Sequence, residues 1–190
     1  MNLDSQRLSQ LGLSLHKFVS IDERVNSPSV QQLCTALAER ASQPAVMGVK
    51  KQEACGEWAA VLSGLAKPGA KCREDSSMQR AFSYALEEQL PNLLCDGEPC
   101  NAAIVTTIAL ACVQSEFKGN MGPFLDAVAG RLGGQGGVMN DSDHQTWSNL
   151  IWACGALEEL EGNRLGDQGV HIISCARVRL PCKASLMLLL

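Results

Sequence analysis

The segment CDGEPC (residues 95–100) is the first candidate for chemistry, because two cysteines enclose Asp96 and Glu98. Thiolates and carboxylates bind metal ions, but zinc takes about four nitrogen or sulfur ligands, and no histidine lies near this segment in the sequence. Gly97 and Pro99 are turn formers. We therefore interpret the segment as a turn and expect neither a metal ion nor a cofactor.

The cysteines of the chain show no C-x-x-C spacing, and they stand at positions 34, 55, 72, 95, 100, 112, 154, 175 and 182. This odd number cannot pair completely within one chain. Cys34, Cys112 and Cys154 lie within apolar helical patterns, where a free thiol packs as a small core residue. Because disulfides persist in oxidising surroundings, this usage favours an intracellular, reducing compartment.

Catalytic arrangements find little support in the sequence. The histidines, His16, His144 and His171, are scattered, and their spacing from serine, cysteine and carboxylate residues indicates no nucleophile–base set. The segment GGQGG (133–137) lacks the Gly-Lys-Ser/Thr of a phosphate-binding loop and follows no predicted strand, so we interpret it as a flexible connector. We predict that the protein is not an enzyme and has no small-molecule substrate.

Candidate contacts to phosphate groups are the basic residues Lys17, Lys67, Lys71, Arg73 and Lys118. Lys17 and Lys67 each follow, by nine residues, the start of an apolar pattern described below. A nucleic-acid backbone rewards repeated positive charge, so we hypothesise that these residues form a track of RNA phosphate contacts. Glu158, Glu159 and Glu161 interrupt the track near the last pattern. Cations near a helix C-terminus also offset the helix dipole without any ligand, and that alternative stays open.

One apolar spacing marks the elements that would position these residues. In TWSNLIWACGAL (146–157), apolar residues follow Trp147 at intervals of 3, 4 and 7, which is one face of an α-helix. The same spacing recurs upstream from Leu8, Trp58 and Val105. The residues expected to pack between helices are Trp58, Leu62, Leu65, Val105, Ile108, Cys112, Trp147, Leu150, Ile151 and Cys154, together with Trp152.

A second apolar segment follows each of these predicted helices. The segments are 29–41, 77–90, 122–132 and, in a poorer version, 170–178. Turn signals precede them, and we expect Ser27 or Ser29, and Ser76 or Ser77, to be helix N-caps. No run of alternating β-branched residues predicts a strand.

Helix pairs with a period of about 40–47 residues are typical of α-solenoids of the HEAT or armadillo kind, in which each hairpin buries its apolar face against its neighbours. We therefore predict an all-α fold, an α-solenoid of about four helical hairpin repeats without a sheet. An irregular helical bundle is the alternative. The chain 1–190 would form one array, with repeats at 3–47, 50–94, 99–138 and 142–180. The apolar tail 181–190 would be the start of a truncated further repeat or a docking segment.

The first helix of the last repeat, WSNLIWACGAL (147–157), resembles a family motif. Octotricopeptide-repeat and RAP-domain proteins, related to the FAST-kinase-like organellar proteins, carry x-x-L-[AS]-N-x-[LI]-W-A-[LC]-A-x-L in that helix. The resemblance implies an α-solenoid that binds RNA in chloroplasts or mitochondria and acts in RNA maturation, stability or translation. The copies at 58–66 and 105–113 keep the apolar spacing without the Trp-Ala pair, and no RAP domain or organelle-targeting segment is visible. Similar repeats in type III effectors of plant-pathogenic bacteria imply protein interaction instead.

The composition and net charge of the chain indicate which kinds of partner it can bind. With 46% hydrophobic and 19% charged residues the chain has the balance of a folded protein, and its net charge of −4 predicts no strong general attraction to nucleic acid. No secretory signal begins the sequence, and SLMLLL (185–190) is too short to span a bilayer. We predict a non-catalytic repeat module that binds single-stranded RNA. A protein-interaction solenoid, or an incomplete fragment of a larger repeat protein, are the alternatives.

Overall fold

The computed structural model describes residues 5–21, 27–43, 54–68, 71–131 and 142–160. Within these ranges every regular element is a helix and no strand occurs, so the prediction of an all-α fold is confirmed for this part of the chain. None of these helices has both the length and the apolar character needed to cross a membrane. Outside the described residues lie the predicted elements 133–137, 170–178 and 181–190, and also Glu161, His171, Cys175 and Cys182.

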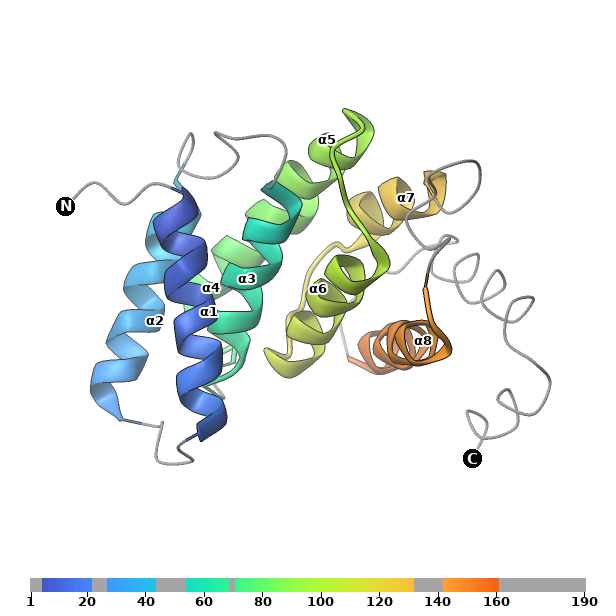
Figure 1. Ribbon diagram of the computed structural model, residues 1–190. Coiled ribbons are helices and arrows are strands. Elements are labelled where there is room, and N and C mark those ends of the chain that lie inside the picture. Colours follow the sequence, from blue (N-terminus) through green and yellow to red (C-terminus); the bar gives the residue numbers. More distant parts are fainter. Residues whose placement is uncertain (1–4, 22–26, 44–53, 69–70, 132–141, 161–190) are drawn as a thin grey trace.

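The helices predicted from the repeated apolar spacing lie next to one another in chain order. They are α1 (Ser5–Ile21), α3 (Ala54–Ala66), α6 (Ala102–Gln114) and α8 (His144–Glu159). α1 packs on α3, α3 on α6, and α6 on α8 (Figure 1). Helices that are far apart in the sequence therefore form one row, in which each first helix is covered by the next.

The intervening helices form a second row. They are α2 (Pro28–Ala41), α4 (Ser76–Ser83), the π-helical η2 (Tyr84–Gln89), α5 (Leu90–Cys95) and α7 (Gly122–Gly130). α2 packs on α4, while η2 and α5 both pack on α7. In the view of Figure 1, α2 and α4 lie behind α1 and α3.

The helical segment predicted at 77–90 is longer and less regular than expected. α4, η2 and α5 follow one another without a break, so the helix continues to Cys95. Pro91, in the first turn of α5, has no N–H to donate to the helical hydrogen-bond ladder. The π-helical turn lies immediately before this interruption, where wider turns and bends of a helix are commonly found.

Side-chain caps fix where α2 and α4 begin. Ser27 caps α2, and it is one of the two serines that were expected to do so. At α4 the cap is Asp75, whose Oδ1 accepts the N–H groups of Ser77 at 2.8 Å and Met78 at 3.2 Å. A carboxylate is a stronger acceptor than a hydroxyl for these N–H donors, so the expected cap at Ser76 or Ser77 is wrong.

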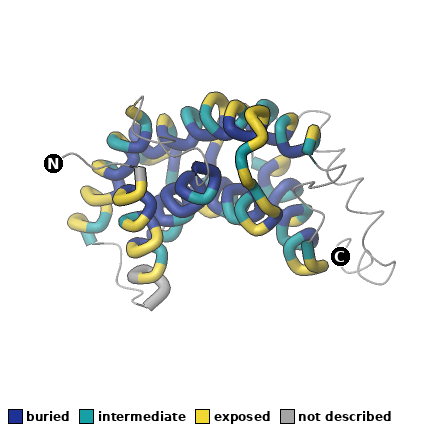
Figure 2. Tube along the Cα trace, turned by 45° about the horizontal axis from the view of Figure 1, so that its top comes forward, coloured by how far each residue is buried: buried dark blue, intermediate teal, exposed yellow. Residues whose placement is uncertain are grey.

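The apolar faces of the first helices meet in the interior of the molecule (Figure 2). Buried in the core are Trp58, Leu62, Leu65, Val105, Ile108, Cys112, Trp147, Leu150 and Cys154. Ile151 is half-buried and packs against the same core. Trp152, by contrast, is 55% exposed, so the expectation that it packs between helices is wrong for the described part of the chain.

Candidate functional site

Three of the cations predicted to contact phosphate come together at the edge where α3 and α6 end. Lys71 and Arg73 lie in the connection that precedes α4, and Lys118 lies in the connection between α6 and α7. Lys17 is exposed in α1, and the partly exposed Lys67 follows α3 directly. Neither of these two forms an ion pair with another residue that the structure describes.

The backbone at this edge is set by the way α6 ends. The N–H of Phe117 donates to the carbonyl of Cys112 at 3.0 Å, and the N–H of Glu116 donates to that of Val113 at 3.1 Å. These two bonds form a Schellman motif, whose first residue beyond the cap takes a left-handed conformation and is usually glycine. Here it is Glu116, at φ 51°. A glutamate therefore occupies a backbone position that costs it conformational energy.

Two further contacts join the connection before α4 to the end of α6. The N–H of Cys72 donates to the carbonyl of Ser115 at 2.8 Å. Phe117 is buried and stacks on Phe82 of α4, with ring centroids 5.7 Å apart. The two connections are thus held against each other by backbone and core contacts, and their charged side chains project from a fixed base.

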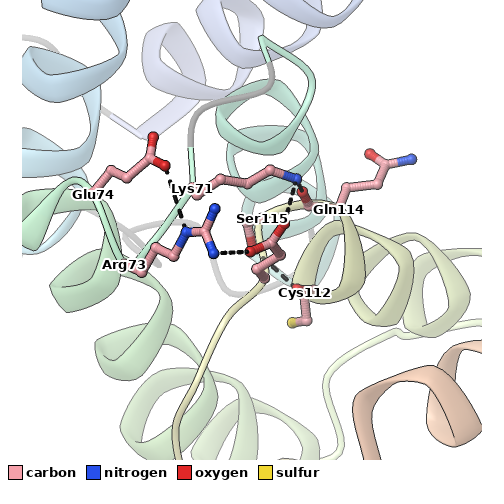
Figure 3. Close-up of polar contacts among 7 residues, drawn as sticks. Lys71, Arg73, Glu74, Cys112, Gln114 and Ser115 are labelled. Atoms are coloured by element: carbon pink, nitrogen blue, oxygen red, sulfur yellow. Dashed lines mark hydrogen bonds and ion pairs between the residues drawn. The ribbon is translucent and has the colours of Figure 1, made fainter. Parts of the chain in front are cut away.

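Lys71 and Arg73 of the neighbouring connection (Figure 3) both form ion pairs with the Glu116 carboxylate. Lys71 Nζ lies 3.2 Å from Glu116 Oε1 and donates to the carbonyl of Gln114 at 2.9 Å. Arg73 Nη1 lies 3.4 Å from Glu116 Oε2, and Arg73 Nε lies 3.5 Å from Glu74 Oε1. One carboxylate therefore holds both basic side chains at the same edge.

All three cations of this edge lower the pKa of Glu116. The pKa of Glu116 lies below its ordinary value, first because of the hydrogen bond from Lys71 and then because of the charges of Lys71, Arg73 and Lys118. The side chain of Lys118 is exposed, while its carbonyl accepts from Gln79 Nε2 at 2.7 Å. The backbone of Lys118 is therefore anchored and its amine faces solvent.

The charge balance of this group of residues determines what it can bind. The two connections carry three cations, Lys71, Arg73 and Lys118, and three carboxylates, Glu74, Asp75 and Glu116, of which Asp75 is engaged in capping α4. Ion pairs between exposed side chains typically contribute only about 0–1 kcal/mol. An anion that offers several oxygens can therefore replace Glu116 as the partner of these cations. We call Lys71, Arg73, Lys118 and Glu116 the turn cluster.

The cations of the turn cluster were predicted from the sequence as site residues, whereas its carboxylate, Glu116, was not. Glu116 stands outside the apolar spacing, and the turn-forming residues of this connection, Gly119 and Asn120, come later than the end of α6. Since no glycine marks the left-handed position, nothing in the local sequence indicated a Schellman motif there. The contact between Glu116 and Lys71 depends on how two distant connections pack.

The other segments considered for chemistry take structural roles. Gly97, at φ 82°, ends α5, and its N–H donates to the carbonyl of Leu94 at 3.1 Å, so CDGEPC is a turn, as predicted. His16 Nδ1 lies 2.7 Å from Ser63 Oγ and links α1 to α3. Among the described residues, no three His, Cys, Asp or Glu side chains are grouped so that they could hold a metal ion.

Comparison of the chain with models of protein families, with curated proteins and with solved structures gave no match in any of the three.

Proposed function

We propose that the chain is a non-catalytic α-solenoid of about four helical hairpin repeats that binds single-stranded RNA. The order of packing supports the solenoid. Successive first helices stack in one row and successive second helices in another, so each hairpin is covered by its neighbours. An array of this kind offers a repeated surface, on which one ligand unit can meet one repeat.

The observation that carries RNA as the ligand is the turn cluster. Its cations come from two successive hairpin connections, so positive charge recurs from one repeat to the next at the same edge. The phosphates of an RNA strand also recur along its length, so successive phosphates could meet the cations of successive repeats. Contacts of this type give affinity without reading the sequence, and they weaken as salt rises.

Glu116 has a defined part in this proposal. In the absence of ligand its carboxylate is the ion-pair partner of Lys71 and Arg73, so a bound phosphate has to displace it. A phosphate then takes over the same two partners. We therefore expect Glu116 to weaken binding by competing with RNA, while Lys71, Arg73 and Lys118 strengthen it.

The resemblance of residues 147–157 to octotricopeptide repeats supports the same ligand and extends the proposal to a setting. The module would act in RNA maturation or translation in a chloroplast or mitochondrion. The buried thiols of Cys34, Cys72, Cys112 and Cys154 suit a reducing compartment.

A protein partner is the second candidate, and Trp152 is the observation that favours it. This indole is 55% exposed on α8, and exposed tryptophans are enriched at the centres of protein interfaces. The net charge of −4 also favours a protein over a nucleic acid.

Binding of the full chain to fluorescent single-stranded RNAs of mixed sequence, at low salt, separates these candidates. We expect saturable binding, with severalfold higher affinity for Glu116→Gln. The matched control is Glu87→Gln, which removes an exposed carboxylate of η2 that forms no ion pair with a described residue. Absence of binding by a chain with a helical circular dichroism spectrum would refute the RNA proposal and leave the protein partner.

A further inference from the structure

The large apolar side chains that remain exposed lie at the two ends of the helical rows. Among the described residues they are Leu13 of α1, Leu33 of α2 and Trp152 of α8, with exposed fractions of 48%, 39% and 55%. α1 and α8 are the first and the last described helices of the first row, and α2 packs on α1 (Figure 1). Single exposed apolar residues are common on protein surfaces, but the outer faces of terminal helices in stacked arrays are normally polar. Both ends depart from that rule.

The exposed side of α1 is apolar at its middle and basic. Its exposed residues include Gln6, Gln10, Leu13 and Lys17. Successive members of this set stand three or four positions apart, so they lie on one side of the helix. The helix contains Arg7 and Lys17 but no acidic residue. We call this side, defined by Leu13 and Lys17, the α1 face.

The exposed side of α8 is apolar at its middle and acidic. Trp152 and Glu159 are both exposed and stand seven positions apart, which places them on one side of the helix. Between them, a Cβ added at Gly155 would meet nothing within 4 Å, so this side is open. α8 contains Glu158 and Glu159 but no Lys or Arg, and the partial negative charge of a helix C-terminus adds to these two carboxylates. We call this side, defined by Trp152 and Glu159, the α8 face.

We propose that the α1 face of one chain docks on the α8 face of a second copy, so that copies associate head to tail. Leu13 would bury its exposed surface against Trp152, and Lys17 would lie near the acidic end of α8. Because the two faces differ, the contact is heterologous, and every copy keeps one free face for the next. The row of first helices would then continue from one chain into another.

A second copy is the occupant that accounts for both ends at once. The opposite charges of the two faces attract and orient them. Docking of the segment 181–190 on α8 would cover Trp152 but would leave Leu13 and Leu33 exposed, and an unrelated protein would need two separate contact sites. Two helix faces make a contact smaller than a standard interface, so we expect weak association. This inference depends on the two rows of helices and not on the proposal that the protein binds RNA.

Sedimentation velocity of the full chain over a range of concentrations, at low salt, tests the proposal. We expect the average mass to rise with concentration beyond that of a dimer, and to fall again as salt screens the charges of the two faces. Leu13→Glu places a carboxylate opposite the acidic α8 face, and Trp152→Ala removes the indole, so each variant alone should stay monomeric. Ala103→Glu, at an exposed position of α6 in the middle of the row, is the matched control and should associate as the wild type does.

An equimolar mixture of Leu13→Glu and Trp152→Ala distinguishes a head-to-tail contact from a symmetric one. Each variant keeps the face that the other has lost, so the mixture should form dimers and nothing larger. Three results would overturn the proposal: a wild type that stays monomeric at every concentration, association of Leu13→Glu equal to that of the wild type, or a mixture that stays monomeric. Circular dichroism checks that the variants fold, and Lys17→Glu replaces Leu13→Glu if that variant does not.

Discussion

Gly12 of α1 and Gly64 of α3 lie backbone to backbone. A Cβ added at Gly64 would come within 2.6 Å of Gly12 Cα, and one added at Gly12 within 2.5 Å of the Ala60 carbonyl oxygen and 2.9 Å of Val61 Cα. Real Cβ atoms do not approach other atoms so closely, and backbone atoms cannot turn aside as a side chain can. The absence of side chains at these two positions therefore sets the distance between α1 and α3.

We predict that Gly64→Ala lowers the stability of the fold. An alanine would gain about 0.5–1 kcal/mol from its better helix propensity, but separating two packed helices costs about 1–3 kcal/mol. The matched control is Gly155→Ala in α8, where an added Cβ meets nothing within 4 Å. Thermal unfolding followed by circular dichroism should show a lower midpoint for Gly64→Ala and an equal or higher one for Gly155→Ala. A shift of the same sign in both would contradict the close approach.

The two tryptophans of α8 should differ in how much their replacement by alanine lowers the stability of the fold. Trp147 is 3% exposed and Trp152 is 55% exposed. Trp147→Ala leaves a large cavity and should cost about 3–5 kcal/mol, whereas Trp152→Ala should change stability by no more than about 0.5 kcal/mol. Urea unfolding of both variants measures the difference. Acrylamide quenching offers a second readout, since Trp152→Ala should remove the most accessible part of the fluorescence.

The lowered pKa of Glu116 predicts a contribution to stability that depends on pH. Because the folded-state pKa lies below the unfolded one, the folded state binds fewer protons, and the contribution is complete above the ordinary glutamate pKa of 4.5. It is lost as the pH falls through the lowered value. The thermal midpoint of Glu116→Gln should therefore lie below that of the wild type at pH 7 and approach it at the acid end.

The control for this pH series is again Glu87→Gln, which removes a carboxylate outside the turn cluster. Its midpoint should differ from the wild type by about the same small amount at every pH where the chain folds. If Glu116→Gln behaved in the same way as this control, the ion pairs of Glu116 with Lys71 and Arg73 would have no measurable effect on folding.

The buried thiols should differ from the exposed one in their rate of alkylation. Burial raises the pKa of Cys34, Cys72 and Cys154 to about 11 in each case, and only the thiolate reacts with iodoacetamide. At pH 8 we expect Cys95, which is exposed, to be labelled before these three. The other three should react only after unfolding in urea. Mass spectrometry of timed samples would contradict this if Cys72 were labelled as fast as Cys95 in the folded chain.

The parts of the fold that could be predicted are those that depend on local periodicity. The spacing that starts at Trp58, Val105 and Trp147 marks buried faces, because a helix brings every third and fourth residue to one side. Trp152 stands five residues after Trp147, outside that spacing. It was expected to pack with the other apolar residues of this helix, and its 55% exposure shows that the spacing was the better guide.

The contacts that join one hairpin to the next could not be predicted. Glu116 with Lys71, and Phe117 with Phe82, are pairs from separate hairpins, and they meet only because the helices pack in a particular order. The serine caps expected for α4 failed for a more local reason. Asp75 stands directly before Ser76, and with one side chain it accepts two helical N–H groups and the hydroxyl of Thr35 in α2, at 2.6 Å from that hydroxyl.

The salt dependence of RNA binding tests the central proposal most directly. The dissociation constant for a single-stranded RNA would be measured from low to physiological salt for the wild type and for Lys71→Gln/Arg73→Gln/Lys118→Gln, with Arg80→Gln as an exposed control cation on α4. For single strands, each phosphate contact contributes about 0.7 to the slope of log affinity against log salt. The triple variant should bind more weakly, with a slope smaller by about 2, and the control should keep nearly the wild-type slope. Equal affinity and slope for the folded triple variant and the wild type would contradict a phosphate-binding turn cluster.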